Sequence, residues 1–237
     1  MPSIPPAVAE VAAAVGNPAR VSVLAALLDG RSLTAKELAH AAGVSPQTAS
    51  GHLARLTGAG LLAVMRQGRH AYFRLATPQV GRLLESIMSV AAEAPRAGPP
   101  PWRADPALRL ARTCYDHYAG RLGVALADAL AARLHVVLGE DGGVVTDEGA
   151  AFLSGFGIDM PTLLQGRRAF CRPCVDWSER RLHLAGAVGA ALAARCTALG
   201  WTARRRNGRA LDITPAGQAG FAAIFGISVD TLHRQGD

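Results

Sequence analysis

The 237-residue sequence has few aromatic residues, no long apolar run and no recognisable signal peptide. Aromatic residues make up only 5% of it, so we expect a core built mainly from Ala, Leu and Val. No apolar run reaches the roughly 18 residues that a membrane-spanning helix needs. The N-terminus has no basic segment ahead of an apolar one, which argues against a secretory signal peptide. These absences predict a cytoplasmic chain with no membrane partner.

The chain also lacks the motifs of common enzymes. There is no glycine-rich phosphate loop, no set of Ser, His and Asp with triad logic, and no close pair of carboxylates, so we expect no enzyme. The four cysteines are expected to be thiols rather than a disulfide framework in a reducing compartment. What the sequence does have is positive charge, with a net charge of +7 and only one lysine, Lys36. Such an excess favours an anionic partner, either nucleic acid or a membrane surface.

Residues 94–106 divide the chain. They read "APRAGPPPWRADP", and five prolines in thirteen residues neither continue a helix nor join a central strand. We therefore predict a linker there, preceded by a domain of residues 1–93 and followed by a domain of residues 107–237. The predicted fold class is mainly α with small β.

The first domain has the pattern of a winged helix-turn-helix. "NPARVSVLAALLDG" predicts a helix that begins at Pro18, and Thr34 and Glu37 have capping-box spacing in "LTAKELAHAAGV". Gly43 ends that short helix, and Ser45 caps the next one, "SPQTASGHLARLTGAGLL". "LLAVMRQGRHAYFRL" then predicts a β-hairpin, or wing.

Such a helix fits the major groove of duplex DNA, where short polar side chains reach base edges, while a basic wing suits phosphates or the minor groove. The partner is therefore predicted to be double-stranded DNA. The predicted DNA-binding residues are Ser45, Gln47, Thr48, Ser50, His52 and Arg55 on the helix, and Arg66, Arg69, His70 and Tyr72 on the wing.

On these motifs, residues 7–93 resemble the ArsR/SmtB family of winged-helix regulators. The resemblance implies a homodimer, paired through the first helix and through "TPQVGRLLESIMSVAAEA" after the wing, on a pseudo-palindromic operator. It also implies repression that an effector relieves. This sequence departs from the family's metal sensors, because "AKELAHAAG" has no cysteine and the helix after the wing has no matching His and Asp pair. Sensing is therefore expected in the second domain.

The second domain contains a repeat of itself. "HYAGRLGVAL" at His117 matches "HLAGAVGAAL" at His183, and "VVTDEGAAFLSGFGID" matches "DITPAGQAGFAAIFGIS" further on. We predict two copies, about 107–165 and 170–232, each a helix, a β-hairpin and a second helix, with Asn207-Gly208 as the turn of the second hairpin. Small residues recur along the two leading helices, which predicts that these helices pack against each other.

The pair Cys171 and Cys174 in "FCRPCVDWSERR" leaves three hypotheses open: a structural turn, a reactive thiol that senses oxidants, or half of a site for zinc or another thiophilic metal. A metal needs two further ligands, for which Cys114, His117 and His183 are the candidates; twofold pairing of the copies would favour Cys114 and His117. Asp176 and Glu179 have capping-box spacing, which predicts a helix that carries both His183 and Cys196. Cys196 is expected in the core. Trp177 is expected as a core anchor, or with the histidines beside a small organic effector.

Together these patterns predict a dimeric, sequence-specific DNA-binding regulator, a repressor whose DNA binding is modulated by a signal sensed in the second domain. The first alternative is a thiol-based redox or metal-binding enzyme that carries a winged-helix targeting module. The second is a DNA-bridging protein without an effector.

Overall fold

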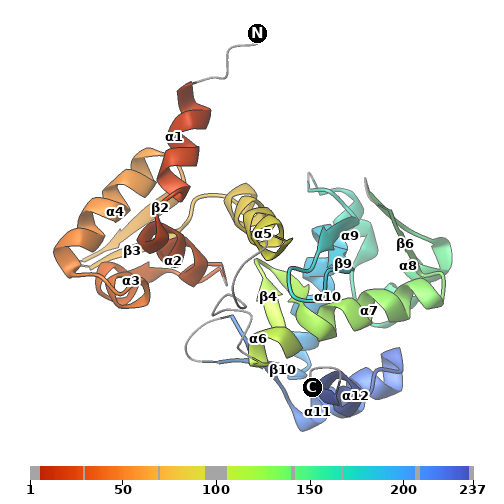
Figure 1. The fold of residues 1–237 in the computed structure, drawn as a ribbon. Coiled ribbons are helices and arrows are strands. Elements are labelled where there is room, and N and C mark those ends of the chain that lie inside the picture. Colours follow the sequence, from red (N-terminus) through yellow and green to blue (C-terminus); the bar gives the residue numbers. More distant parts are fainter. Residues whose placement is uncertain are drawn as a thin grey trace. The chain divides into compact units, whose positions relative to one another are not determined.

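The computed structural model describes residues 6–28, 30–68, 70–93, 106–139, 142–166, 168–205 and 209–234 (Figure 1). The chain forms two compact units, Met1–Glu85 and Ser86–Asp237, and the division falls inside a helix, Pro78–Glu93. The predicted linker, except for Pro106, lies outside the described residues. So do Arg69 of the wing and the Asn207-Gly208 turn.

The first unit is a winged helix-turn-helix, as the sequence predicted. Its three strands form one antiparallel sheet in the order β1-β3-β2, in which β2 and β3 are the wing. The elements, in chain order, are α1 (Pro6–Val15), α2 (Pro18–Ala26), β1 (Leu33–Thr34), α3 (Ala35–Ala42), α4 (Pro46–Gly58), β2 (Leu62–Gln67), β3 (His70–Leu75) and α5 (Pro78–Glu93).

Local capping explains where these helices begin. The predicted capping box is present: the Thr34 side chain accepts from the backbone N–H of Glu37, and the Glu37 carboxylate accepts from the backbone N–H of Thr34. Gly43 adopts the left-handed conformation that ends α3, and the Ser45 side chain caps α4. The reciprocal bonds satisfy backbone donors that a helix start otherwise leaves unpaired.

The second unit is built from four two-stranded antiparallel hairpins and the helices that follow them. Its elements are α6 (Pro106–Leu110), β4 (Arg112–Cys114), β5 (His117–Ala119), α7 (Gly120–Ala132), β6 (Val136–Leu138), β7 (Gly143–Val145), α8 (Asp147–Gly155), α9 (Met160–Leu164), β8 (Arg172–Val175), β9 (Leu182–Ala185), α10 (Gly186–Ala198), β10 (Thr202–Arg204), β11 (Leu211–Ile213), α11 (Pro215–Gly220), the π-helical turn η2 (Phe221–Phe225) and α12 (Val229–Arg234).

This unit has two hairpins that the sequence did not predict, and one predicted helix start is wrong. The hairpins β4–β5 and β8–β9 each precede a small-residue helix, in addition to the hairpins β6–β7 and β10–β11 that follow these helices. The segment that begins at Asp176 is the turn between β8 and β9 rather than a helix start, and His183 lies in strand β9. Helix α10 begins only at Gly186, so His183 and Cys196 do not share a helix.

The small residues allow each helix to pack on a strand of the other hairpin. Helix α7 contacts β9 and α10 contacts β5, rather than the two helices packing mainly on each other as predicted. A Cβ at Gly123 would overlap the carbonyl of Tyr118 and lie 3.7 Å from the Cβ of His183. A Cβ at Gly189 would overlap the carbonyl of Leu184 and lie 3.4 Å from the Cβ of His117. Each histidine thus lies against a glycine of the opposite helix.

Candidate DNA-binding surface and candidate metal centre

Helix α4 buries one face and exposes the face that carries the predicted DNA contacts. Ala49, Leu53 and Leu56 are buried in the first unit. Gln47, Ser50 and Arg55 are exposed, and His52 is half-buried. The apolar positions follow helical spacing, which leaves the polar positions together on the outer side.

Capping engages two of the predicted contacts. The Ser45 hydroxyl accepts from the backbone N–H of Thr48 at 3.2 Å and lies 2.9 Å from the Thr48 hydroxyl. Both side chains are exposed but already partnered. On the wing, Arg66 and His70 are exposed, and half-buried Tyr72 has its ring 6.4 Å from the ring of His70.

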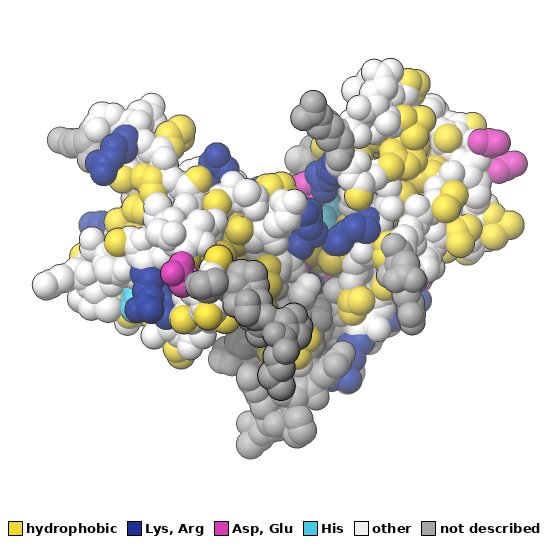
Figure 2. All heavy atoms as spheres, turned by 90° about the horizontal axis from the view of Figure 1, so that it is seen from above, with side chains coloured by type: hydrophobic (Ala, Val, Ile, Leu, Met, Phe, Trp, Pro, Cys, Tyr) yellow, Lys and Arg dark blue, Asp and Glu magenta, His cyan; other side chains and the backbone are white. Residues whose placement is uncertain are grey.

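Figure 2 shows Lys and Arg side chains exposed on each unit, and the net charge of the chain is +7. Among the helices that the structure describes, none combines the length and the apolar character required to cross a membrane.

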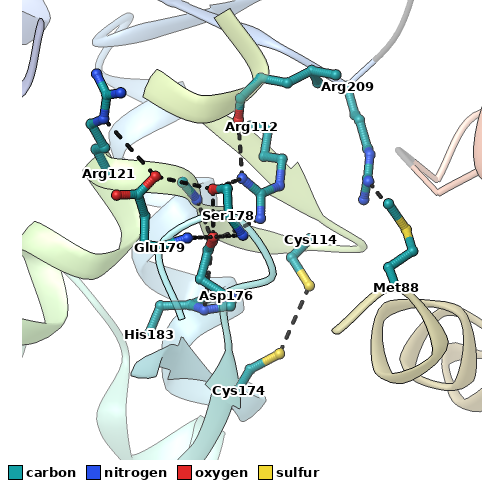
Figure 3. Close-up of polar contacts among 12 residues, drawn as sticks. Met88, Arg112, Cys114, Arg121, Cys174, Asp176, Ser178, Glu179, His183 and Arg209 are labelled. Atoms are coloured by element: carbon teal, nitrogen blue, oxygen red, sulfur yellow. Dashed lines mark hydrogen bonds and ion pairs between the residues drawn. The ribbon is translucent and has the colours of Figure 1, made fainter. Parts of the chain in front are cut away.

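In the second unit, two pairs of side chains from hairpins that are distant in the sequence meet in one cluster: Cys114 and His117 with Cys174 and His183. One ligand atom from each lies within 4.8 Å of all the others. The two sulfur atoms are 3.9 Å apart (Figure 3), and the two Nε2 atoms are 3.2 Å apart. Cys114, His117 and His183 are buried, and Cys174 is partly buried.

Hairpin register explains how the cluster forms. Cys114 lies directly opposite His117 in β4–β5, and Cys174 lies directly opposite His183 in β8–β9. Residues opposite each other in an antiparallel ladder have their side chains on the same face. Each hairpin therefore presents one thiol and one imidazole as a neighbouring pair.

Cys171 does not join this cluster, so the set of Cys114, His117, Cys171 and Cys174, one of those that the sequence left open, is not the one that the structure brings together. Cys171 lies one residue before β8 and packs in the core, where its Sγ is 2.7 Å from the position that a Cβ on Gly143 would occupy. Burial raises the pKa of the Cys171 thiol to about 11. Cys196 is fully buried in the core, and burial raises its pKa to about 12. All four cysteines are thiols, as predicted.

A carboxylate lies behind each histidine of the cluster. His117 Nδ1 is 3.2 Å from Asp116 Oδ1, and Arg168 holds Asp116 with two hydrogen bonds of 2.5 and 3.0 Å. Burial alone would raise the pKa of Asp116, but the hydrogen bonds from His117 and Arg168 lower it to about 2. On the other side, His183 Nδ1 is 4.0 Å from Asp176 Oδ2. A carboxylate bonded to the outer ring nitrogen, as Asp116 is to His117, orients metal-binding histidines in proteins. The distance from His183 to Asp176 is too long for a hydrogen bond.

The cluster favours negative charge on sulfur. The hydrogen bond from Cys114 lowers the pKa of Cys174 most, and His117 and His183 lower it further, against the opposing effect of burial. Burial lowers the pKa of His117, but hydrogen bonds with Asp116 and Cys174 raise it beyond this effect. The thiolate is the form of cysteine that binds metals and reacts with oxidants.

Asp176, which Figure 3 shows between Ser178 and His183, links the β8–β9 turn to the first hairpin. Its Oδ2 accepts from Arg112 at 2.8 Å and from the backbone N–H of Gly120 at 2.6 Å. Its Oδ1 accepts from the backbone N–H groups of Ser178 and Glu179 and from the Ser178 hydroxyl. Burial raises the pKa of this carboxyl, yet the Arg112 charge and these bonds hold it well below its usual range.

Trp177 and Trp201 occupy two different environments in the second unit. Trp177 is a core anchor, buried with the Arg112 guanidinium 4.2 Å from its ring centroid. Trp201 instead packs against Phe156 and Phe221. They do not form one aromatic group around the histidines, which leaves the organic effector as an untested hypothesis.

Comparisons with known proteins agree with the first unit and extend to the second. Residues 15–64 match the model of a helix-turn-helix domain. An uncharacterised HTH-type transcriptional regulator of Bacillus subtilis, YdfF, is 38% identical over 224 residues, covering 94% of this chain and 99% of its own. The HTH-type transcriptional regulator CmtR of Mycobacterium tuberculosis is 33% identical over 84 residues, covering 35% of this chain and 70% of its own.

Among solved structures, the homodimeric winged helix-turn-helix domain of Mb0332 from Mycobacterium bovis, a possible ArsR-family regulator, is 32% identical. That likeness covers 40% of this chain and 86% of the fragment, with a TM-score of 0.35. The match to YdfF covers 94% of this chain and therefore includes the second unit, whereas the matches to CmtR and Mb0332 cover 35% and 40% of it.

Proposed function

Because the chain belongs to the family of HTH-type transcriptional regulators, we propose that it is a repressor that binds a specific operator as a homodimer. A signal received by the second unit changes the affinity for DNA. The protein acts in the cytoplasm, where a bacterial operator is accessible.

The exposed face of α4 is the observation that carries this proposal. Gln47, Ser50 and Arg55 are exposed on the second helix of the helix-turn-helix, while its other face is buried. This second helix is the one that enters the major groove, with its N-terminal residues nearest the bases. We assign Gln47 to an adenine, with which its amide is able to pair, and Arg55 to a guanine or a phosphate. We assign Arg66 and His70 of the wing, both exposed, to the neighbouring phosphates.

Exposed apolar side chains support the homodimer. Leu83, Ile87 and Val90 follow one face of α5 at helical spacing, and Val8 is 52% exposed on α1. The family resemblance implies pairing through the helix after the wing, which is α5, and through the first helix, which in the structure is α1 rather than the helix that begins at Pro18. Two recognition helices in such a dimer read half-sites about 34 Å apart.

The second unit is proposed to be a duplicated domain. Both halves have the same order: a hairpin, a small-residue helix, a second hairpin and a capped helix that begins after Thr146 or Thr214. A regulator of nearly the same length, YdfF, shares the whole chain, so the second unit is a regular part of such regulators. This supports a receiving role for it.

The test is selection of a binding site from random DNA, followed by titration of that site with the full-length protein. Gln47→Ala is expected to weaken binding roughly 5- to 150-fold on the selected site and to change scrambled DNA little. Arg55→Ala should weaken both. The matched control is Arg205→Ala, an exposed arginine of the second unit that pairs with Asp212 and should bind like the wild type. Equal binding of the selected site by Gln47→Ala and wild type would refute the assignment.

A further inference from the structure

We propose that Cys114, His117, Cys174 and His183 form a closed tetrahedral site for one Zn²⁺ ion in the second unit. Two thiolates and two imidazoles are a ligand set typical of structural zinc. The inference does not depend on the proposed operator binding, because it concerns the second unit alone.

The distances between ligand atoms fit this ion. With Zn–S of about 2.3 Å and Zn–N of about 2.0–2.1 Å, the edges of a regular tetrahedron are about 3.8 Å between sulfurs and about 3.3 Å between nitrogens. The sulfurs of Cys114 and Cys174 are 3.9 Å apart, and the Nε2 atoms of His117 and His183 are 3.2 Å apart. These two edges match the tetrahedron, and the four edges between sulfur and nitrogen are all within 4.8 Å, so small side-chain shifts would complete the site.

The charges nearby also fit. Two thiolates, two neutral imidazoles and one divalent cation sum to zero, which is the form least costly to bury. The basic groups at the site do not compete for this role, because Arg112 is paired with Asp176 and Arg168 with Asp116. The two buried Nε2 atoms face each other at 3.2 Å, so both lie on the side on which the ion would bind.

Asp116 positions one ligand. By accepting from His117 Nδ1–H, it fixes the tautomer whose Nε2 lone pair points into the cluster. The imidazole is then held in the orientation that the ion needs before the ion arrives. Asp116 is a positioning residue and does not itself reach the site.

The ion would join the two halves of the unit. Each hairpin provides one cysteine and one histidine. The two cysteines are 60 residues apart in the chain, and the two histidines are 66 residues apart. Four protein ligands leave no open position for a substrate, so the site stabilises the fold rather than performing chemistry. Because the ion would bind the folded second unit and not the unfolded chain, the free energy of zinc binding would add to the free energy of unfolding.

The experiment measures zinc in the full-length protein by mass spectrometry of metals, and cobalt binding by visible absorption. Wild type is expected to hold about one zinc per chain and to show the strong visible bands of tetrahedral Co²⁺ with thiolate ligands. Cys114→Ser and Cys174→Ser should lose the ion. Cys171→Ser is the matched control, because that cysteine is buried nearby but outside the cluster, and it should keep the ion.

A second pair of variants, which keeps all four ligands, tests the site even if the cysteine variants fail to fold. Asp116→Asn should lower zinc affinity about 10- to 100-fold, with the tetrahedral cobalt spectrum retained. Asp128→Asn, an exposed carboxylate of α7, should leave the affinity unchanged. Chelation should lower the thermal midpoint of wild type and of Cys171→Ser.

Several outcomes would overturn the proposal: wild type that stays metal-free after saturation with Zn²⁺, a weak octahedral cobalt spectrum, or equal loss of zinc in Cys171→Ser. A disulfide between Cys114 and Cys174 that forms equally fast with and without Zn²⁺ would also overturn it and would indicate a redox pair. Operator affinity is measured separately with the α4 variants, so failure of one proposal is distinguishable from failure of the other.

Discussion

Replacing Asp176 by Asn should destabilise the second unit strongly, although only one atom of the side chain changes. Both Asp176 and its partner Arg112 have fully buried side chains, with an ion-pair distance of 2.8 Å. Removing one partner of a buried pair leaves an uncompensated charge, which costs about 3–5 kcal/mol. The amide also retains only one acceptor oxygen, so the donors at one of the two former oxygens lose their bond.

Urea unfolding followed by tryptophan fluorescence isolates the effect, because all three tryptophans, at positions 102, 177 and 201, follow the first unit. A loss of about 4 kcal/mol with an m value of about 2 kcal/mol per molar urea lowers the midpoint by about 2 M. Excess chelator keeps the metal state constant. Asp128→Asn, which breaks an ion pair with both side chains about half exposed, should cost less than about 1 kcal/mol. Equal shifts for Asp176→Asn and Asp128→Asn would refute the reasoning.

Three further substitutions or reactions follow from the packing. A Cβ added at Gly51 or Gly58 of α4 would have no atom within 4 Å, so Gly51→Ala and Gly58→Ala should each raise the stability of the first unit by about 0.5–1 kcal/mol in thermal unfolding. Only Gly51→Ala should weaken operator binding, because Gly51 lies beside the exposed polar side chains of α4. Wild-type affinity for both would contradict the placement of DNA on this face. Gly189→Ala should lower the stability of the second unit by about 1–3 kcal/mol in urea, since its methyl group overlaps a backbone carbonyl of β9. Alkylation at pH 8 should be slow at Cys171 and Cys196 in the folded protein, because burial raises their pKa to about 11 and about 12, and fast in urea, where thiols titrate near 8.5; mass spectrometry of each peptide checks this.

Local signals explain why the first unit was predictable from the sequence. The capping box of Thr34 and Glu37, the left-handed Gly43 and the cap at Ser45 each act within four residues of the chain. A cap of this kind is visible in the sequence because its donor and acceptor are sequence neighbours. The predicted polar face of α4 then follows from the positions of Leu53 and Leu56.

The hairpins β4–β5 and β8–β9 of the second unit were not predicted. Strand β4 has three residues, and its turn to β5 passes through Tyr115 in the left-handed conformation, where glycine or asparagine would have indicated a turn. The β8–β9 turn gave a misleading signal instead. Asp176 does accept from the N–H of Glu179, as a helix cap would, but Arg180 then turns left-handed and the chain returns as a strand. Helical and turn conformations share this first bond, so the capping pattern alone does not distinguish them.

The same turn explains why the four residues of the proposed zinc site were hard to identify as a set. The cysteines of the two hairpins are 60 residues apart and the histidines 66, so the second hairpin has six more residues between its Cys and its His. Those six are the turn Asp176–Arg181, which lengthens a Cys-x-x-His pair into a spacing that no metal motif shows. The insertion also carries Asp176, whose bonds to Arg112 and Gly120 reach the first hairpin and the start of α7. The turn Asp176–Arg181, in which the two copies of the repeat differ, therefore links the two halves of the second unit through Asp176. These bonds hold the hairpins β4–β5 and β8–β9 at the distance that brings the four side chains of the cluster together.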